Sequence, residues 1–218
     1  MINLTLKDGS VRQVAKGTTL YELASSLSQG LARVAVVGKV NGELKDLDYA
    51  LTEDAEVEIL TLDSEEGLEV LRHSTSHLLA QAVKNLFPGT ILGIGPAIAN
   101  GFYYDFDSEH TFTPEDLAKI EAEMQRLAKE DNSFKCKLIS REEAIQYFQD
   151  SGEKYKVELI NDLPEDAQIS LYTHGNFTDL CAGPHVPSTK MLKTFKLQSV
   201  AGAYWRGSEK NKMLQRIY

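Results

Sequence analysis

The stretch from Ser64 to Leu79, SEEGLEVLRHSTSHLL, predicts the start of a long helix. Ser64 is a favourable N-cap residue, and the two glutamates after it suit the positive end of a helix dipole. Apolar residues then recur at helical spacing as far as Phe87, where Pro88-Gly89 stops the pattern. We therefore expect a helix over residues 65–87 at the centre of the second part of the chain.

Two histidines share one face of this expected helix. His73 and His77 are one turn apart, and both lie nearly opposite the apolar stripe that includes Leu71 and Leu79. A lone buried histidine often only fills a core, but a pair that points away from the stripe fits that explanation poorly. The pair indicates a functional site, with a solvated helix face as the alternative.

A second pair of reactive residues lies far downstream. Residues 177–186, FTDLCAGPHV, hold Cys181 and His185 around a Gly-Pro turn. If the two pairs meet, three chemistries are open. Two helix histidines with a cysteine and a histidine from a turn make an acceptable tetrahedral zinc set. Cys181 activated by a histidine would be a nucleophile. A metal-free pocket would instead hold a water with histidine and lysine side chains. Spacing alone favours zinc.

Residues 1–62 are expected to form a small domain of their own. Two alternating strands are followed by a short helix that begins after Thr18 or Thr19 and ends at Gln29-Gly30. Val34 to Val37 then reads as a buried strand, and Asn41-Gly42 as a hairpin turn before a closing strand. This order of elements predicts a β-grasp, or ubiquitin-like, fold. No residue type in it suggests catalysis.

Residues 63–218 predict an α+β domain with a mostly antiparallel sheet. Apolar residues alternate with polar ones over 155–159, which predicts a strand with Lys156 on its polar face. Cys136 falls on the apolar face of another expected strand, as a small core residue. Residues 195–200 predict a further strand. His110 and His174 have polar neighbours and are expected at the surface.

The composition excludes several classes of protein. Charged residues make up 25% of the 218 residues and hydrophobic residues 42%, and no apolar run is long enough to cross a bilayer. The first residues lack the pattern of a secretory signal, and two cysteines are too few for a disulfide framework, so we expect a cytoplasmic protein. The net charge is −9, yet residues 187–218 carry seven basic residues against one acidic residue. That segment predicts either a solvated surface or a contact for phosphates.

Four parts of the sequence together resemble one family. They are residues 65–79 with both helix histidines, IGP at 94–96 with NGFYYD at 100–105, DLCAGPHVP at 179–187, and AGAYWRG at 201–207 with NKMLQRIY at 211–218. In this order and spacing, the whole chain looks like the N-terminal half of a bacterial threonyl-tRNA synthetase.

The resemblance implies a TGS module with a β-grasp fold over residues 1–62. It implies an editing domain, shared with alanyl-tRNA synthetases and freestanding deacylases, over residues 63–218. The family's synthetic core, with its ATP, threonine and zinc sites, would follow Tyr218, so we expect no aminoacylation from these residues. Full-length members would form homodimers through that further part.

The resemblance also implies roles for seven residues. His73 and Lys156 are the candidate catalytic residues, which would position the attacking water. The candidate substrate-binding residues are Tyr104 at the ester or the terminal adenosine, and His77, Asp179, Cys181 and His185 in the wall that reads the seryl group. The Cys-Ala-Gly-Pro-His sequence matches the threonyl branch and favours a metal-free pocket. If zinc is bound, as in the alanyl branch, its ligands would be His73, His77, Cys181 and His185.

The implied activity is hydrolysis of the ester of mischarged seryl-tRNA(Thr), with the tRNA acceptor end as partner and no cofactor required. Serine lacks one methyl group of threonine, which is worth only about 1–3 kcal/mol of discrimination in a binding pocket, so a second, hydrolytic pocket is useful. Two alternatives stay open. One is a zinc-dependent, alanyl-type trans-editing deacylase, and the other is a non-catalytic tRNA-binding fragment.

Overall fold

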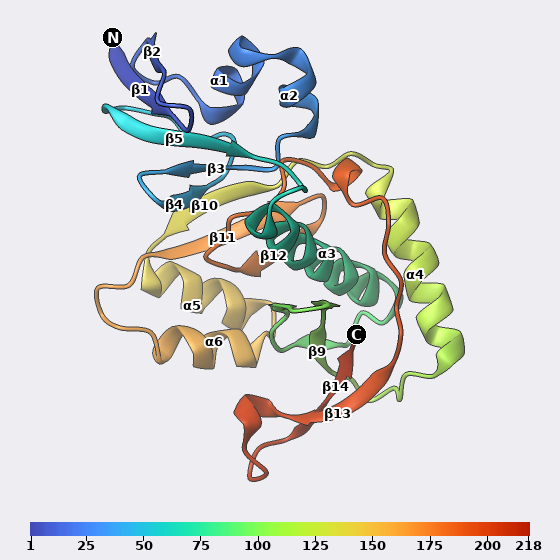
Figure 1. Ribbon diagram of the computed structural model, residues 1–218. Helices are drawn as coiled ribbons and strands as arrows, with labels where there is room; N and C mark the ends of the chain where they lie inside the picture. The colour runs from blue at the N-terminus through green and yellow to red at the C-terminus, as the bar shows by residue number, and fades with distance from the viewer. The chain divides into compact units, whose positions relative to one another are not determined.

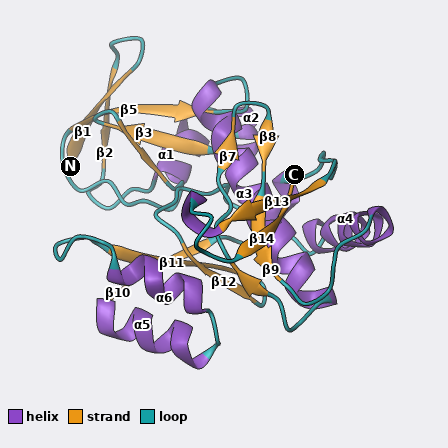
Figure 2. Ribbon diagram, turned by 90° about the horizontal axis from the view of Figure 1, so that it is seen from below, coloured by secondary structure: helices purple, strands orange, loops and turns teal.

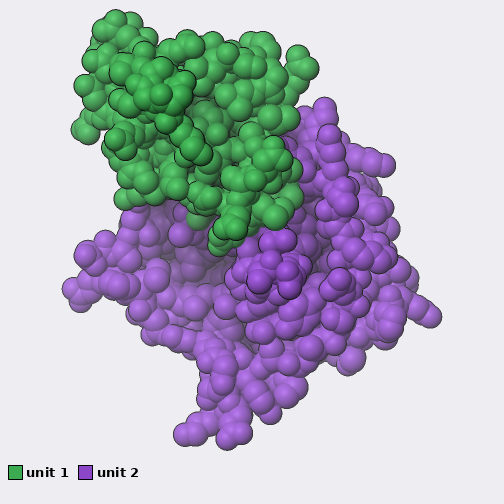
Figure 3. Space-filling view, in the orientation of Figure 1, with its two compact units in different colours: residues 1–71, 183–187 green, residues 72–182, 188–218 purple.

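The computed structural model describes residues 1–218 and has a mixed α+β architecture with mostly antiparallel sheets (Figure 1). The chain forms two compact units, which Figure 3 colours separately. The first unit contains residues 1–71 and 183–187, and the second contains residues 72–182 and 188–218. The boundary after residue 62 stays a prediction. None of the helices has the length and apolar character needed to cross a membrane.

The first unit is built on a five-stranded sheet in the order β2-β1-β5-β3-β4. β1 and β5 run parallel, and the other neighbours are antiparallel. Its elements are β1 (Ile2–Leu6), β2 (Val11–Val14), α1 (Leu20–Leu27), α2 (Gln29–Val34), β3 (Val37–Val40), β4 (Glu43–Lys45) and β5 (Ala55–Leu60). The β-grasp prediction is confirmed.

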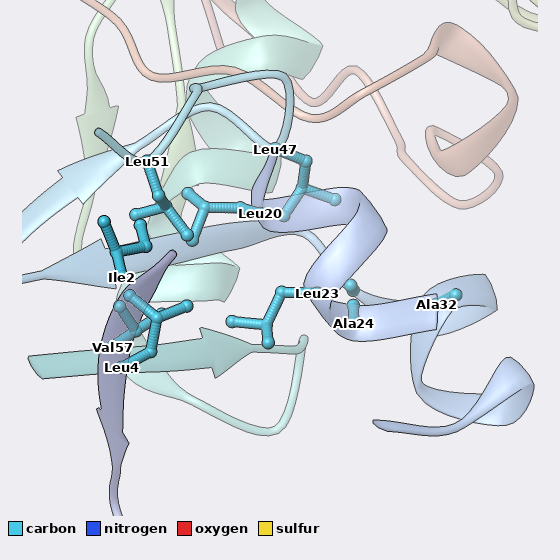
Figure 4. Close-up of a cluster of buried hydrophobic side chains, with 10 residues drawn as sticks. Ile2, Leu4, Leu20, Leu23, Ala24, Ala32, Leu47, Leu51 and Val57 are labelled. Atoms are coloured by element: carbon cyan, nitrogen blue, oxygen red, sulfur yellow. The ribbon is translucent and has the colours of Figure 1, made fainter. Parts of the chain in front are cut away.

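The core of the first unit lies between α1 and the sheet (Figure 4). Leu20 and Leu23 of the helix and Leu4 of β1 are fully buried there. The side chain of Thr19 accepts a hydrogen bond from the Glu22 backbone N–H, and the Glu22 carboxylate accepts one from the Thr19 N–H. This reciprocal cap fixes the start of the helix, so its apolar side meets the sheet.

The strand expected over 34–37 is wrong. Residues 29–34 form a second short helix, α2, and β3 begins only at Val37. Ser28 ends α1, and its side chain accepts a hydrogen bond from the Leu31 N–H. Gln29-Gly30 therefore continues helical structure. The hairpin turn is confirmed, because Asn41 and Gly42 have φ angles of 49° and 85° between the paired strands β3 and β4.

The second unit contains a four-stranded sheet, β13-β14-β9-β6, a three-stranded sheet, β10-β11-β12, and a small β7-β8 ribbon (Figure 2). Its helices are most of α3 (Glu65–Leu86), α4 (Pro114–Ala128), α5 (Arg141–Asp150) and α6 (Lys154–Asn161). Its strands are β6 (Ile91–Leu92), β7 (Ala97–Ile98), β8 (Gly101–Phe102), β9 (Tyr104–Asp107), β10 (Lys135–Ile139), β11 (Ile169–His174), β12 (Phe177–Leu180), β13 (Val200–Tyr204) and β14 (Met213–Ile217), with short 3-10 turns at Thr189–Met191 (η1) and Trp205–Gly207 (η2).

The long helix α3 is confirmed, including its cap, where the Ser64 Oγ accepts a hydrogen bond from the Gly67 N–H. Within the second unit this helix is buried on every side from Ser74 to Val83. The alternative of a solvated face is therefore wrong for His77, whose side chain is 2% exposed. Burial on every face explains why the polar residues of this segment need partners within the protein.

Lys156 lies on a helix, so the strand expected over 155–159 is wrong. The chain turns at Gly152 and enters α6, which packs beside α5 over the three-stranded sheet (Figure 1). Tyr155, Lys156 and Ile160 are the buried residues of α6. A buried lysine interrupts the apolar pattern that would have identified the helix, and the alternation that remained looked like a strand.

Cys136 is exposed, in contrast to the core position expected for it. It lies on β10, an edge strand that pairs only with β11. Ile139 is paired with Ile169, and both pack in the core under α5 and α6. Because side chains alternate along a strand, Cys136 points to the opposite face, where its edge strand leaves it open to solvent.

The strand expected over 195–200 is also misplaced. The regular strand is β13, which begins at Val200 and pairs with β14. β14 in turn pairs with β9 through Gln215 and Phe106, residues that are far apart in the sequence. The pairing partners fix where the strand begins, and no local signal at residues 195–199 contains that information.

Candidate functional site

The two helix histidines contact one another inside the second unit. Their ring centroids are 4.9 Å apart, with the rings inclined at 68°. His73 is half-buried, whereas His77 is buried. Burial, followed by the nearby His73, lowers the pKa of His77 well below its usual value. His77 is therefore a neutral ring at physiological pH, and His73 is the member of the pair that solvent reaches.

The β11–β12 hairpin brings Asp179 and Cys181 to these histidines. His73 Nε2 lies 3.0 Å from Cys181 Sγ, and His77 Nε2 lies 3.7 Å from Asp179 Oδ2. The Cys181 N–H donates to the Ser170 carbonyl, and the Ser170 hydroxyl donates to the Cys181 carbonyl. These two bonds hold Cys181 in place just beyond the end of β12. The part of the prediction that joins His73, His77 and Cys181 agrees with the geometry.

A buried network joins Asp179 to two further predicted residues. The Tyr104 hydroxyl donates to Asp179 Oδ2 over 2.6 Å, and Lys156 Nζ lies 2.8 Å from Asp179 Oδ1. Lys156 Nζ also donates to the Tyr104 oxygen over 3.0 Å, which closes the triangle. Burial and the neighbouring Asp179 raise the pKa of Tyr104 well above its usual range. The phenol is therefore protonated and acts as a donor.

Gly95 makes room for the Tyr104 ring. A Cβ atom at Gly95 would lie 2.1 Å from Tyr104 Cδ2, which is far inside van der Waals contact. The Gly95 carbonyl also accepts a hydrogen bond from Ser76 Oγ of α3. The loop between β6 and β7 is thus held against the helix and against the ring at once. In the sequence, Gly95 stood out only as part of the IGP stretch at 94–96.

His185 belongs to the segment 183–187, which is grouped with the first unit. Its side chain is buried, and its backbone N–H donates to Asp46 Oδ1 over 2.9 Å. Its expected place in the pocket wall stays a prediction.

His174 is buried, so its expected surface position is wrong. Its Nε2 lies 3.0 Å from the Gln81 side-chain oxygen, and its ring packs between Phe134 and Phe177. Burial lowers its pKa to about 4. β11 is buried on both faces, so His174, which shares a face with Ser170 and Tyr172, lies inside although turn residues follow it. By contrast, His110 is about half exposed and pairs with Asp116.

The donor set also suits a zinc ion. The ligand atoms of His73, His77 and Cys181 all lie within 4.8 Å of one another. Zinc bonds of about 2.0–2.3 Å in a tetrahedral arrangement place neighbouring donors roughly 3.3–3.8 Å apart. Small side-chain movements would therefore let the three residues hold zinc, with the metal serving as a Lewis acid. Asp179 and Lys156 form an ion pair with one another and do not belong to this set.

Comparison with known proteins finds a matching domain family at each end of the chain. Residues 2–61 match the TGS domain, and residues 169–218 match the threonyl and alanyl tRNA synthetase second additional domain. The threonine–tRNA ligase of Desulforamulus reducens is 64% identical over all 218 residues, and those of Acetivibrio thermocellus and Clostridium novyi are 60% and 57% identical. The chain resembles the N-terminal region of threonyl-tRNA synthetase.

The chain spans 34%, about a third, of the length of these curated relatives. The second additional domain match covers Asp179, Cys181 and His185, but it does not reach His73, Tyr104 or Lys156. Four of the seven candidate site residues, His73, His77, Tyr104 and Lys156, therefore come from α3, β9 and α6, upstream of the matched residues.

Proposed function

We propose that these 218 residues hydrolyse the ester bond of mischarged seryl-tRNA(Thr). The observation that carries the proposal is the closed Tyr104–Asp179–Lys156 network, which lies beside His73, His77 and Cys181 in a region similar to threonyl-tRNA synthetase. A buried set of charged and polar groups is costly to fold, and such sets concentrate at functional sites. Hydrolysis of an ester requires a water, a way to remove its proton and a donor for the carbonyl oxygen.

His73 and Lys156 are the proposed catalytic residues. An ammonium group has three N–H donors, of which Lys156 directs one to Tyr104 while it forms an ion pair with Asp179. A remaining N–H is proposed to hold the attacking water or the developing oxyanion. His73 is half-buried, so its ring can meet a water and accept its proton as the water oxygen bonds to the ester carbon. That proton then goes to the departing ribose oxygen as the ester bond breaks.

The remaining residues act on the substrate. Asp179 carries a negative charge that suits the ammonium group of the seryl moiety, and Tyr104 fixes the carboxylate in one orientation. His77 is neutral and buried, so it forms a wall beside Asp179. Cys181, with His185, is proposed to limit the space next to the side chain of the amino acid. A pocket of this kind admits serine and excludes the additional methyl group of threonine.

The test of this proposal compares His73→Ala with His110→Ala on seryl-tRNA(Thr). Losing a positioned general base slows hydrolysis by about 10²–10⁴-fold. We expect a loss of that size in His73→Ala and a rate within twofold of the unaltered protein in His110→Ala, because His110 lies outside the site. Urea unfolding of both variants shows whether the fold is intact. An intact His73→Ala protein with full activity contradicts the assigned role.

A zinc-dependent hydrolase is the second candidate, and the convergence of His73, His77 and Cys181 favours it. It predicts that chelator treatment abolishes hydrolysis and that zinc restores it. The metal-free proposal predicts the same rate before and after treatment, in protein whose metal content has been measured. A non-catalytic tRNA-binding region would instead bind tRNA without hydrolysing either aminoacyl ester.

A further inference from the structure

The basic segment 187–218 is less uniformly positive than its composition indicates. Four of its seven basic side chains form ion pairs within the second unit: Lys196 with Glu121, Arg206 with Glu158 and Asp162, Lys212 with Asp107, and Arg216 with Asp105. These pairs tie the segment to the body of the domain. The charge that stays available to a partner comes from the other three, Lys190, Lys193 and Lys210.

Two of these three lysines share a cavity with Lys129, at the end of α4. The cavity has a volume of about 380 Å³ and lies between the last turn of α4 and residues 190–195. Its apolar lining includes Leu192 and Phe195, and the exposed lysines 129, 190 and 193 surround it. None of the three lysines forms an ion pair, so the cavity combines an apolar floor with an uncompensated positive rim.

The walls of the cavity are held in place. Thr189, in η1, is fully buried, its N–H donates to the Asn132 carbonyl, and its hydroxyl accepts from the Asn132 N–H. The Leu197 N–H donates to the Glu121 carboxylate on α4, so both ends of the segment are attached next to that helix. In Figure 1 the orange-red segment accordingly follows α4 along its length. A fixed cavity loses little conformational entropy when a ligand binds.

We propose that this cavity binds the sugar–phosphate backbone of the tRNA at a point outside the aminoacyl ester site. The inference rests on the proposed function, because it takes tRNA as the substrate. A protein with a net charge of −9 repels RNA over most of its surface, so binding needs a local positive site. The three lysines provide it for phosphates, and Phe195 and Leu192 provide an apolar surface for a ribose or a base face. A volume of 380 Å³ is within the range of pockets that take small ligands and would hold a single nucleotide unit.

The test uses the full 218-residue chain and uncharged tRNA(Thr) over a series of salt concentrations. The cavity variant is Lys129→Ala/Lys190→Ala/Lys193→Ala. The charge-matched control is Lys16→Ala/Lys119→Ala/Lys210→Ala, which alters exposed lysines that form no ion pair. Each lost phosphate contact reduces the slope of log affinity against log salt by about 1. We expect the slope of the cavity variant to be smaller by about 3 than that of the unaltered protein. Its affinity at low salt should be at least tenfold weaker.

The control variant should bind within about threefold of the unaltered protein. Equal losses in the two variants, or unchanged binding by the cavity variant, would overturn the inference, as would the absence of any tRNA binding by the unaltered chain.

A seryl ester on a short CCA oligonucleotide separates this inference from the proposed function. The cavity variant should hydrolyse it at the unaltered rate, and a loss there would place the cavity in the ester site. If the unaltered chain does not hydrolyse it, the proposed function fails, while the binding comparison still decides the inference.

Discussion

The Tyr104 hydroxyl donates a 2.6 Å hydrogen bond to Asp179 Oδ2 in the interior of the second unit. Tyr104 is fully buried, and Asp179 is only 2% exposed. Lys156 contacts both groups and is equally buried. A carboxylate and an ammonium group that are both removed from water depend on one another for stability, since neither finds a substitute partner in bulk solvent.

Asp179→Asn should therefore be strongly destabilising. The substitution leaves the Lys156 ammonium group buried without its counter-charge, and breaking such a pair costs about 3–5 kcal/mol in the free energy of unfolding. The exposed pair between Lys7 and Glu58 is the matched control. Lys7→Ala should cost less than about 1 kcal/mol. Urea unfolding measures both values.

A double variant distinguishes this explanation from a simple loss of packing. In Asp179→Asn/Lys156→Met the buried charge is gone, so the protein should regain part of the stability that Asp179→Asn loses. Stability that falls further in the double variant would show that the charge pair is not the cause. Neither variant should hydrolyse seryl-tRNA(Thr), because both lack the proposed water-binding ammonium group or its partner.

Gly95→Ala should disturb the site through the Tyr104 ring. The new methyl group would occupy a position 2.1 Å from Tyr104 Cδ2, and the ring has to move to admit it. We expect overpacking to cost about 1–3 kcal/mol in stability, together with at least a tenfold loss in hydrolysis as the Tyr104–Asp179 bond is displaced.

Gly89→Ala is the control for that substitution. Gly89 follows α3, and a Cβ atom there would have no heavy atom within 4 Å. Stability and activity should both stay close to those of the unaltered protein. If Gly95→Ala behaves in the same way as Gly89→Ala, the close approach of Gly95 to the ring has no functional importance.

Local signals in the sequence were sufficient for several elements. Ser64 and Pro88-Gly89 gave the ends of α3, and Asn41-Gly42 gave the turn between β3 and β4. Each of these signals acts within a few residues, so it can be read without knowing the fold. The spacing of His73 and His77 on one helix face was predictable for the same reason.

Non-local relationships could not be predicted from local patterns. Lys156 looked like an exposed residue of a strand because its partner Asp179 comes from a different element, and a buried lysine has no apolar signature. His174 looked like a surface residue because Gln81, its hydrogen-bond partner, lies on α3. Only the family resemblance brought Lys156 into the candidate site, and it did so without predicting its helix.

Stability should fall on acidification because of His174. Its pKa is lowered to about 4 by burial, whereas an unfolded histidine takes up a proton near pH 6.5. The folded state holds the neutral ring, so the contribution of this group is complete above pH 6.5. It is lost progressively as the pH falls from 6.5 to 4, by a total of about 3 kcal/mol.

His174→Gln removes this titration and keeps a polar side chain next to Gln81. Urea unfolding at several pH values between 6.5 and 5 should show a smaller decline of stability in the variant than in the unaltered protein. This pH range lies above the pKa of most carboxyl groups, so carboxyl titration contributes little to the change in stability there. The difference between the two proteins then reports the titration of His174. Identical slopes for the two proteins would contradict the assignment.

The most direct test of the proposed function is the rate at which the unaltered chain deacylates seryl-tRNA(Thr) and threonyl-tRNA(Thr) in parallel. A pocket that senses one methyl group discriminates by about 10–200-fold. We predict that the seryl ester is hydrolysed faster by a factor in that range and that the threonyl ester is nearly spared. Equal rates on the two substrates, or no hydrolysis of either, would contradict the account.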